Sequence, residues 1–385
     1  MLVLGVIAFF VMVGFGVVIP VLPVYVRSFG VGYVEVGAVV SAFALVRLIA
    51  SPFCGWLINH GGERTILAIG IGIVAVSSGL VGIAETYPQV LILRGIGGVG
   101  SAMFTISAMT LLLGTTASSV RGRAMGFYQG GFLIGGMAGP ALGGLLAVIS
   151  LQAPFFFYAG TLAIAGLVGL VLLQPKTRDV PDGPAATPVP FRLVARDPRF
   201  IAACLANLAQ GWSSFGVRSA LVPVLVVEIL DRPPVWTGIA FAVAAVAQTI
   251  ALAPAGRFVD KVGRRPAIVG AYAVGAVAML AVPFAPDIWL LMVALCVYGV
   301  AAAFMGTAPA AAVGDAAGAR GGQPVAVFSA FSDVGAIVGP LVAGALVDAV
   351  SFPAAFGTAV VFMLIASVYA LRMPKESRPA SPMAS

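Results

Sequence analysis

Long apolar runs alternate with short polar segments along the whole chain. The runs are about twenty to twenty-eight residues long, which suits α-helices that cross the roughly 30 Å hydrocarbon core of a bilayer. Barrel strands would be shorter and would change polarity at every second residue. The pattern predicts an all-α integral membrane protein with twelve spans, near residues 3–26, 35–58, 65–86, 88–113, 122–149, 152–174, 200–229, 234–256, 265–285, 287–313, 323–347 and 352–373.

A longer polar segment, rich in Pro, Ala and charged residues, separates the sixth run from the seventh. We therefore expect an N-terminal six-helix bundle at 1–174, a linker at 175–199, a C-terminal six-helix bundle at 200–373 and a tail at 374–385. Pro23 matches Pro223 at an offset of about two hundred residues, and the pair Gly139-Pro140 matches Gly339-Pro340. These matches indicate two pseudo-symmetric halves, which run parallel because each has an even number of spans.

Composition and charge support a membrane location. Hydrophobic residues make up 61% of the chain and charged residues 9%, against roughly 45–50% and 25% in soluble domains. The formal charge of +7 does not indicate a nucleic-acid partner, because the basic residues are scattered through short loops. If both termini are cytoplasmic, sixteen of the 21 Lys and Arg residues lie inside and only Arg27 and Arg232 lie outside. This asymmetry predicts a multi-pass cytoplasmic-membrane protein with both termini and the linker inside.

Two spans carry glycine at helical spacing. Residues four apart share one helix face, so such glycines leave a strip of bare backbone that another helix can approach closely. A proline within the strip removes one backbone donor and bends the helix there. We expect this motif to govern conformational exchange in both halves, through Gly135, Gly139, Pro140, Gly143 and Gly144 in span five and Gly335, Gly339 and Pro340 in span eleven.

The loop after span eight has a distinctive spacing of glycine, aspartate and paired basic residues, in Gly256, Asp260, Gly263, Arg264 and Arg265. This spacing resembles the signature loop of the major facilitator superfamily, and the resemblance covers essentially the whole chain. It implies the major facilitator fold. It also implies that the charges of this loop help to hold the cytoplasmic side closed; the alternative is a merely basic inner loop.

The corresponding loop of the first half departs from the family pattern. It contains Gly55, Asn59, Gly62 and Arg64. Asn59 stands where the family usually has Asp, and Glu63 stands where it usually has a basic residue. We therefore expect the charge clasp to depend mainly on the second copy.

Two further resemblances bear on the direction of transport. The glycine and proline motif of span five is similar to the signature of the superfamily's antiporters, which are drug and metabolite exporters. The stretch from Gly14 to Tyr25 in span one is similar to the twelve-helix drug-exporter branch. Generic helix packing by small residues is the alternative explanation of the span-five motif.

Charged residues inside the spans are candidates for proton coupling, because a charge at that depth is costly unless it has a partner or water. Asp333 is the only carboxylate deep in a span, and the intramembrane cations are Arg47, Arg94 and Arg218. Arg94 and the small residues after it are similar to a superfamily motif, which implies a role in proton coupling; a structural hydrogen bond is the alternative. We expect Asp333 to exchange protons with the help of one of these arginines. A fixed ion pair is the competing interpretation, and carboxylates at span ends, such as Glu228 and Asp348, are expected to be solvated.

The resemblance also implies that spans one, four, seven and ten line a substrate cavity. Polar, aromatic and methionine side chains of these spans and of span five are the candidates, namely Phe15, Met103, Gln129, Asn207, Gln210, Phe215, Tyr298 and Met305. An apolar, aromatic wall favours amphipathic substrates, whereas ordered polar groups would favour a sugar or an organic acid.

The sequence favours a secondary transporter over an enzyme. It contains no phosphate-binding G-x-x-x-x-G-K-[ST] loop and no H-E-x-x-H pair. We expect no cofactor and no metal. The leading prediction is a proton-coupled exporter of small amphipathic molecules that functions as a monomer in the lipid bilayer. The alternative is an uptake permease, a proton symporter or uniporter, for a sugar, organic acid or similar polar solute.

Overall fold

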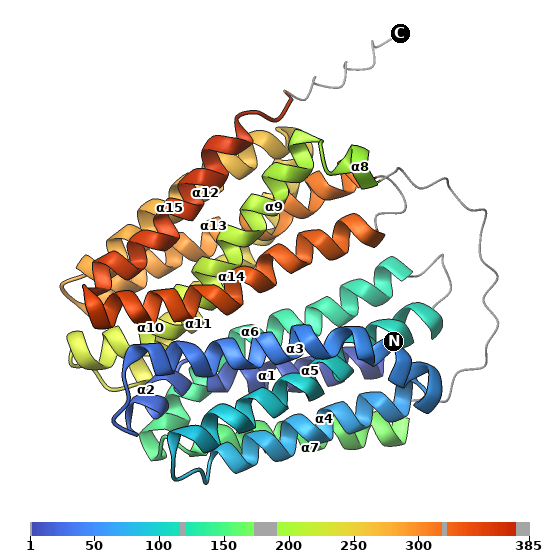
Figure 1. Cartoon of the computed structure of the whole chain (residues 1–385), viewed down its shortest axis with the longest axis vertical. Helices are drawn as coiled ribbons and strands as arrows, with labels where there is room; N and C mark the ends of the chain where they lie inside the picture. The colour runs from blue at the N-terminus through green and yellow to red at the C-terminus, as the bar shows by residue number, and fades with distance from the viewer. Residues whose placement is uncertain (1, 116–120, 173–190, 318–321, 375–385) are drawn as a thin grey trace.

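The computed structural model describes residues 2–115, 121–172, 191–317 and 322–374, and all of their regular structure is helical (Figure 1). Eleven helices of these residues are long and apolar enough to cross a membrane, and a shorter apolar helix covers Val3–Val18. The predicted all-α membrane fold with twelve spans is therefore confirmed. The predicted linker and tail lie largely outside the described residues.

The first seven helices pack around one buried cluster that draws on residues 4–165. The predicted first span is broken, because α1 ends at Val18 and the chain turns before α2, next to Pro20 and Pro23. The helices are α1 (Leu2–Val18), α2 (Leu22–Arg27), α3 (Tyr33–Gly61), α4 (Glu63–Val81), α5 (Tyr87–Thr115), α6 (Arg121–Ile149) and α7 (Ala153–Leu172).

The remaining helices pack around a second cluster that draws on residues 194–373. They are α8 (Phe191–Val194), α9 (Pro198–Gln210), α10 (Ser219–Val224), α11 (Val235–Lys261), α12 (Arg264–Ala281), α13 (Ile288–Ala317), α14 (Gly322–Ala349) and α15 (Phe352–Ala370). The predicted seventh span is one continuous rod in which α9 and α10 alternate with two π-helical segments, Gly211–Arg218 and Leu225–Ile229. π-helical segments are rare and often occur at functional sites.

Local signals explain several helix ends. Gly62 and Gly263 lie between consecutive spans of the two halves, and their φ angles of 76° and 116° are open to glycine but not to most other residues. Asp197 caps α9 by accepting a hydrogen bond from the backbone N–H of Arg199. The side chain of Arg199 donates to the same carboxylate, which lowers the pKa of Asp197.

The two groups of helices meet at one end of the molecule and diverge toward the other (Figure 1). We call the divergent end, where α7 ends and α8 begins, the linker side, and the opposite end the far side. The contacts between the groups are formed mainly by α3 against α14 and by α6 against α11. The halves therefore contact each other toward the far side and diverge toward the linker side (Figure 1).

Candidate functional site

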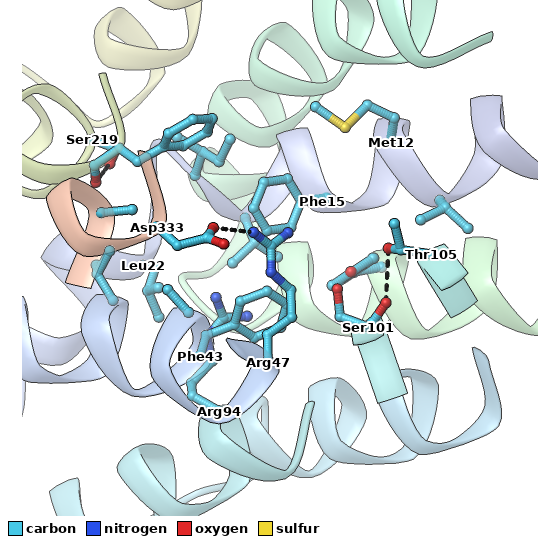
Figure 2. Close-up of a pocket in the computed structure, with 18 of the residues that line it drawn as sticks. Met12, Phe15, Leu22, Phe43, Arg47, Arg94, Ser101, Thr105, Ser219 and Asp333 are labelled. Atoms are coloured by element: carbon cyan, nitrogen blue, oxygen red, sulfur yellow. Dashed lines mark hydrogen bonds and ion pairs between the residues drawn. The ribbon is translucent and has the colours of Figure 1, made fainter. Parts of the chain in front are cut away.

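A pocket of about 380 Å³ lies between the two halves of the molecule. The first half contributes α1, α2, α3, α5, α6 and α7, and the second half contributes the seventh span and α14. Most of the wall is apolar, with phenylalanines from both halves, and the charged side chains gather in one part of it (Figure 2). The described wall residues with ionisable or aromatic side chains are Phe15, Phe43, Arg47, Arg94, Phe104, Phe132, Tyr158, Phe215 and Asp333.

An ion pair crosses the pocket from one half to the other. The Nη2 atom of Arg47 on α3 lies 3.0 Å from Oδ1 of Asp333 on α14 (Figure 2). The two side chains remain 39% and 25% exposed, so water reaches both of them. Among the three candidate arginines, Arg47 is the one that the structure pairs with Asp333.

Arg94 takes part in the same pocket but differs from Arg47. It is only 7% exposed, and its guanidinium lies 4.6 Å from the centre of the Phe43 ring. Within the described part of the chain, its Nε atom has no hydrogen-bond partner. Gly98 allows α5 to approach α3 this closely, because a Cβ there would lie 3.0 Å from the backbone nitrogen of Arg47.

Arg218 lies in the π-helical part of the seventh span. Its guanidinium lies 5.3 Å from the ring centres of both Phe241 and Tyr298, which favours it by cation–π attraction. It does not line the pocket and pairs with no carboxylate among the described residues. Arg218 thus differs from Arg47 and Arg94, which both line the pocket.

Only some of the expected cavity residues face the pocket. Phe15 and Phe215 line it. Three others are corrections, because they are packed between helices of the same half: Met103 at 5% exposure, Tyr298 at 0% and Met305 at 1%. The hydroxyl of Tyr298 is hydrogen-bonded to the hydroxyls of Ser213 and Ser214.

The three amide candidates, Gln129, Asn207 and Gln210, do not line this pocket either. Asn207 donates instead to the carbonyl of Phe328 at 2.7 Å, which ties α9 to α14. Phe43 and Ser101 line the pocket although they were not among the predicted cavity residues. Helical spacing could have found them, since Phe43 lies one turn before Arg47 and Ser101 two turns after Arg94.

Residues at the far side join the two halves. Arg27 Nε lies 2.8 Å from Glu228 Oε1, and the hydroxyl of Tyr33 donates to the same carboxylate. The two oxygens of Asp348, at the end of α14, accept the backbone N–H groups of Tyr33 and Val34 at 3.1 and 2.9 Å. The expectation that Glu228 and Asp348 are merely solvated is therefore wrong. Asp348 belongs to the second half and thus caps the N-terminus of α3 in the first half.

We expect Asp348→Asn to favour opening of the far side. The substitution removes a negative charge from the N-terminus of α3, where such a charge contributes about 0.3–1 kcal/mol. The open population should therefore rise about two- to fivefold. The measurement is the distance distribution between spin labels at positions 28 and 232, in protein without its native cysteines.

Asp287→Asn is the matched control for this experiment. Asp287 also accepts a helix N-terminal N–H, that of Leu290 at 2.9 Å, but both residues belong to the same half. Equal distance distributions in the two variants would show that the cap from Asp348 does not hold the far side closed.

On the linker side, Arg264 of the signature loop forms an ion pair within its own half. Arg264 Nε lies 2.8 Å from Oδ2 of Asp315 at the end of α13. Arg64 of the first-half loop donates to the carbonyl of Leu170. Asp260 forms no ion pair with any described residue, and the side chain of Asn59 lies outside the described part. With the halves apart on the linker side, the ion pair between Arg264 and Asp315 thus lies within the second half.

The glycine strip of α6 lies against α1, as the spacing predicted. A Cβ on Gly135 would lie 2.7 Å from the carbonyl oxygen of Phe9, and one on Gly139 would lie 2.7 Å from Cα of Gly16. This contact is within one half. Gly144, one residue past the strip, instead faces α11 of the other half, where a Cβ would lie 2.8 Å from the carbonyl oxygen of Val235.

The second copy of the motif has the same division of contacts. A Cβ on Gly335 would lie 2.5 Å from the backbone nitrogen of Trp212, within the second half, and one on Gly344 would lie 2.9 Å from Cα of Val34 in α3. Each motif thus serves both the packing of its own half and the contact between halves.

Comparisons with known proteins agree with this architecture. A family model described as Major Facilitator Superfamily matches the chain twice, over residues 4–230 and 208–384. The chain is 26% identical over 344 residues to the quinolone resistance protein NorA of Staphylococcus aureus (strain COL), and the aligned region covers 88% of each protein. It is 29% identical over 331 residues to the synaptic vesicular amine transporter of Bos taurus, and the aligned region covers 83% of this chain and 62% of that protein.

Two solved structures share the fold. A bacterial homolog of the human lysosomal transporter Spinster, in an inward-facing and unoccupied conformation, has a TM-score of 0.80 at 16% identity, covering 96% of this chain and 95% of that one. A mutant of the nucleoside transporter NupG has a TM-score of 0.77 at 15% identity, covering 96% and 98%.

Two helical bundles that enclose a charged pocket between them define a membrane transporter rather than an enzyme. The chain belongs to the major facilitator superfamily.

Proposed function

We propose that this protein is a proton-coupled secondary transporter that exports small amphipathic molecules from the cytoplasm by alternating access. The observation that carries the proposal is the ion pair between Arg47 and Asp333 in the wall of the pocket. The pair joins α3 of one half to α14 of the other, so a change in the charge of Asp333 acts directly on the contact between the halves. The two halves, 1–174 and 200–373, are the moving units, and one chain is sufficient for transport.

The arrangement of the halves supports alternating access. The far side is closed by the contacts of Glu228 and Asp348, whereas the bundles diverge on the linker side (Figure 1). Transport requires a second arrangement in which the far-side contacts break and the signature loop of Asp260 and Arg264 approaches the first half. The charges of that loop are then available to hold the linker side closed.

Protonation supplies the coupling in this proposal. Because the two side chains are partly exposed, their attraction contributes about 1 kcal/mol rather than the larger value of a dry pair. Neutralising Asp333 removes this contribution and changes the balance between the two arrangements about fivefold. Proton entry from one side and release to the other then drive the cycle.

Export is supported by the relatives and by the pocket wall. The name of NorA refers to quinolone resistance, and the other relative is named as a vesicular amine transporter. The apolar wall and its phenylalanines suit molecules with a large apolar body. A permease for a polar solute would require an array of hydrogen-bonding groups in place of these rings.

Transport assays in proteoliposomes with and without an imposed pH gradient test the proposal. Purified protein should accumulate an amphipathic fluorescent substrate against its gradient only when the proton gradient is present. Accumulation of a sugar or an organic acid in the direction of proton entry would support the uptake permease instead. Absence of gradient-driven transport for every compound would contradict both.

The orientation is part of the proposal, with the linker side in the cytoplasm. We expect Ser28→Cys, on the far side, to react with a membrane-impermeant maleimide in intact cells, and Arg196→Cys, at the linker side, to react only after the cells are opened. Both side chains are exposed. The native thiols of Cys54, Cys204 and Cys296 are replaced first. Reaction at position 196 in intact cells would invert the proposed orientation.

A further inference from the structure

The charges that line the pocket do not balance. Its described wall contains two arginines, Arg47 and Arg94, and one carboxylate, Asp333. The carboxylate lies 3.0 Å from Arg47, so these two charges neutralise each other. Arg94 is left as the uncompensated charge of the wall.

The setting of Arg94 makes this charge available to a ligand. The residue is 7% exposed, and its Nε atom has no hydrogen-bond partner within the described part of the chain. The ring of Phe43, 4.6 Å from the guanidinium, is attractive but accepts no conventional hydrogen bond. A buried cation without an acceptor is costly, and a bound carboxylate would remove that cost through a charge-assisted hydrogen bond.

The rest of the wall is suited to an apolar body. Phe15, Phe132 and Phe215 line the pocket together with aliphatic side chains. The volume of about 380 Å³ lies within the range of roughly 300–1,000 Å³ that is usual for small-molecule sites. The pocket therefore offers one cationic point beside a broad apolar surface.

We propose that the pocket selects amphipathic molecules that carry one negative charge, with a carboxylate or similar acidic group at Arg94 and the apolar body against the phenylalanines. This inference rests on the proposed transport function and specifies its substrate class. A cation of the same size would meet Arg94 and find Asp333 already paired with Arg47. The charge preference is thus opposite to the one that the name of the amine transporter indicates for that relative.

A set of three dansyl probes of similar size tests the proposal. Dansylglycine is an anion at neutral pH, dansylglycine amide is neutral, and N-dansylethylenediamine carries a cationic amine. Fluorescence titration of purified protein in nanodiscs, with empty nanodiscs as the background, gives the three dissociation constants. Dansylglycine should bind about tenfold more tightly than either of the other probes, which is the effect of one hydrogen bond to a charged group. Equal binding of the three probes, or tightest binding of the cation, would overturn the proposal.

Substitution of Arg94 locates the preference. Arg94→Gln should lose the tenfold advantage of dansylglycine while binding of the neutral amide stays unchanged, which also shows that the variant is folded. Arg94→Lys, which keeps the charge, should retain most of the preference. Arg218→Gln removes another intramembrane arginine that does not line the pocket, and it should leave all three dissociation constants unchanged.

The outcomes separate this inference from the proposed function. If dansylglycine amide binds and is transported under a proton gradient but the anion has no advantage, the transporter proposal stands and the substrate class is wrong. An Arg94→Gln variant that keeps its preference for the anion would likewise contradict the role of Arg94. If none of the probes binds, the pocket is not an amphiphile site and both proposals fail at this pocket.

Discussion

Asp333→Asn should abolish proton-driven transport while substrate still binds. Asparagine has nearly the shape of aspartate and retains an oxygen that can accept a hydrogen bond from Arg47, but it cannot lose a proton. The variant is therefore held in the equivalent of the protonated state, and it should carry substrate down a gradient without concentrating it. The measurement is uptake into proteoliposomes with and without a pH gradient, together with a binding titration.

The double variant Arg47→Gln with Asp333→Asn distinguishes coupling from a structural role. If the pair only holds α3 and α14 together, replacing both charges with neutral groups that still bond to each other should restore proton-driven transport. If Asp333 carries the proton, the double variant stays uncoupled. Accumulation with unchanged proton dependence in the single variant would show that the coupling group lies elsewhere.

Gly139→Leu should eliminate transport although the protein still inserts into the membrane. A Cβ at this position would lie 2.7 Å from Cα of Gly16, and backbone atoms cannot move aside as a flexible side chain can. Overpacking of this kind costs about 1–3 kcal/mol. It should force α6 away from α1 and change the angle at which the outer end of α6 meets α11. Transport assays and thermal unfolding measure the two effects.

Gly130→Leu is the matched control, because it adds the same side chain to the same helix where nothing lies within 4 Å of an added Cβ. It should transport normally. Gly139→Ala should have an intermediate effect, since it adds only the Cβ. Normal transport by Gly139→Leu would contradict the requirement for close packing at this position.

The spans were predictable because their signal is local. A membrane span needs only a sufficient length of apolar residues, and this property is visible without knowledge of any partner. The tight turns at Gly62 and Gly263 and the close approach of Gly135 and Gly139 follow from local geometry as well. The break after Val18 was the main local feature that the hydropathy pattern concealed, since both sides of it are apolar.

The composition of the pocket was less predictable, because it depends on the rotation of each helix about its axis. In a membrane protein, the lipid-facing and buried faces are both apolar, so hydropathy gives little information about which face turns inward. Phe15 and Phe215 face the pocket. Met305 and Tyr298 lie in equally apolar stretches of sequence but are packed inside the second half.

The sequence alone determined the membrane class, the number and limits of most spans, the repeat, and the identity of the costly intramembrane charges. Only the tertiary structure decided which charges meet. Arg47 is 286 residues from Asp333 in the chain, and Arg27 is 201 residues from Glu228, so no local pattern records these pairs. They depend on the docking of one six-helix half against the other, and for the same reason only the structure shows that Arg94 has no carboxylate partner in the described wall of the pocket.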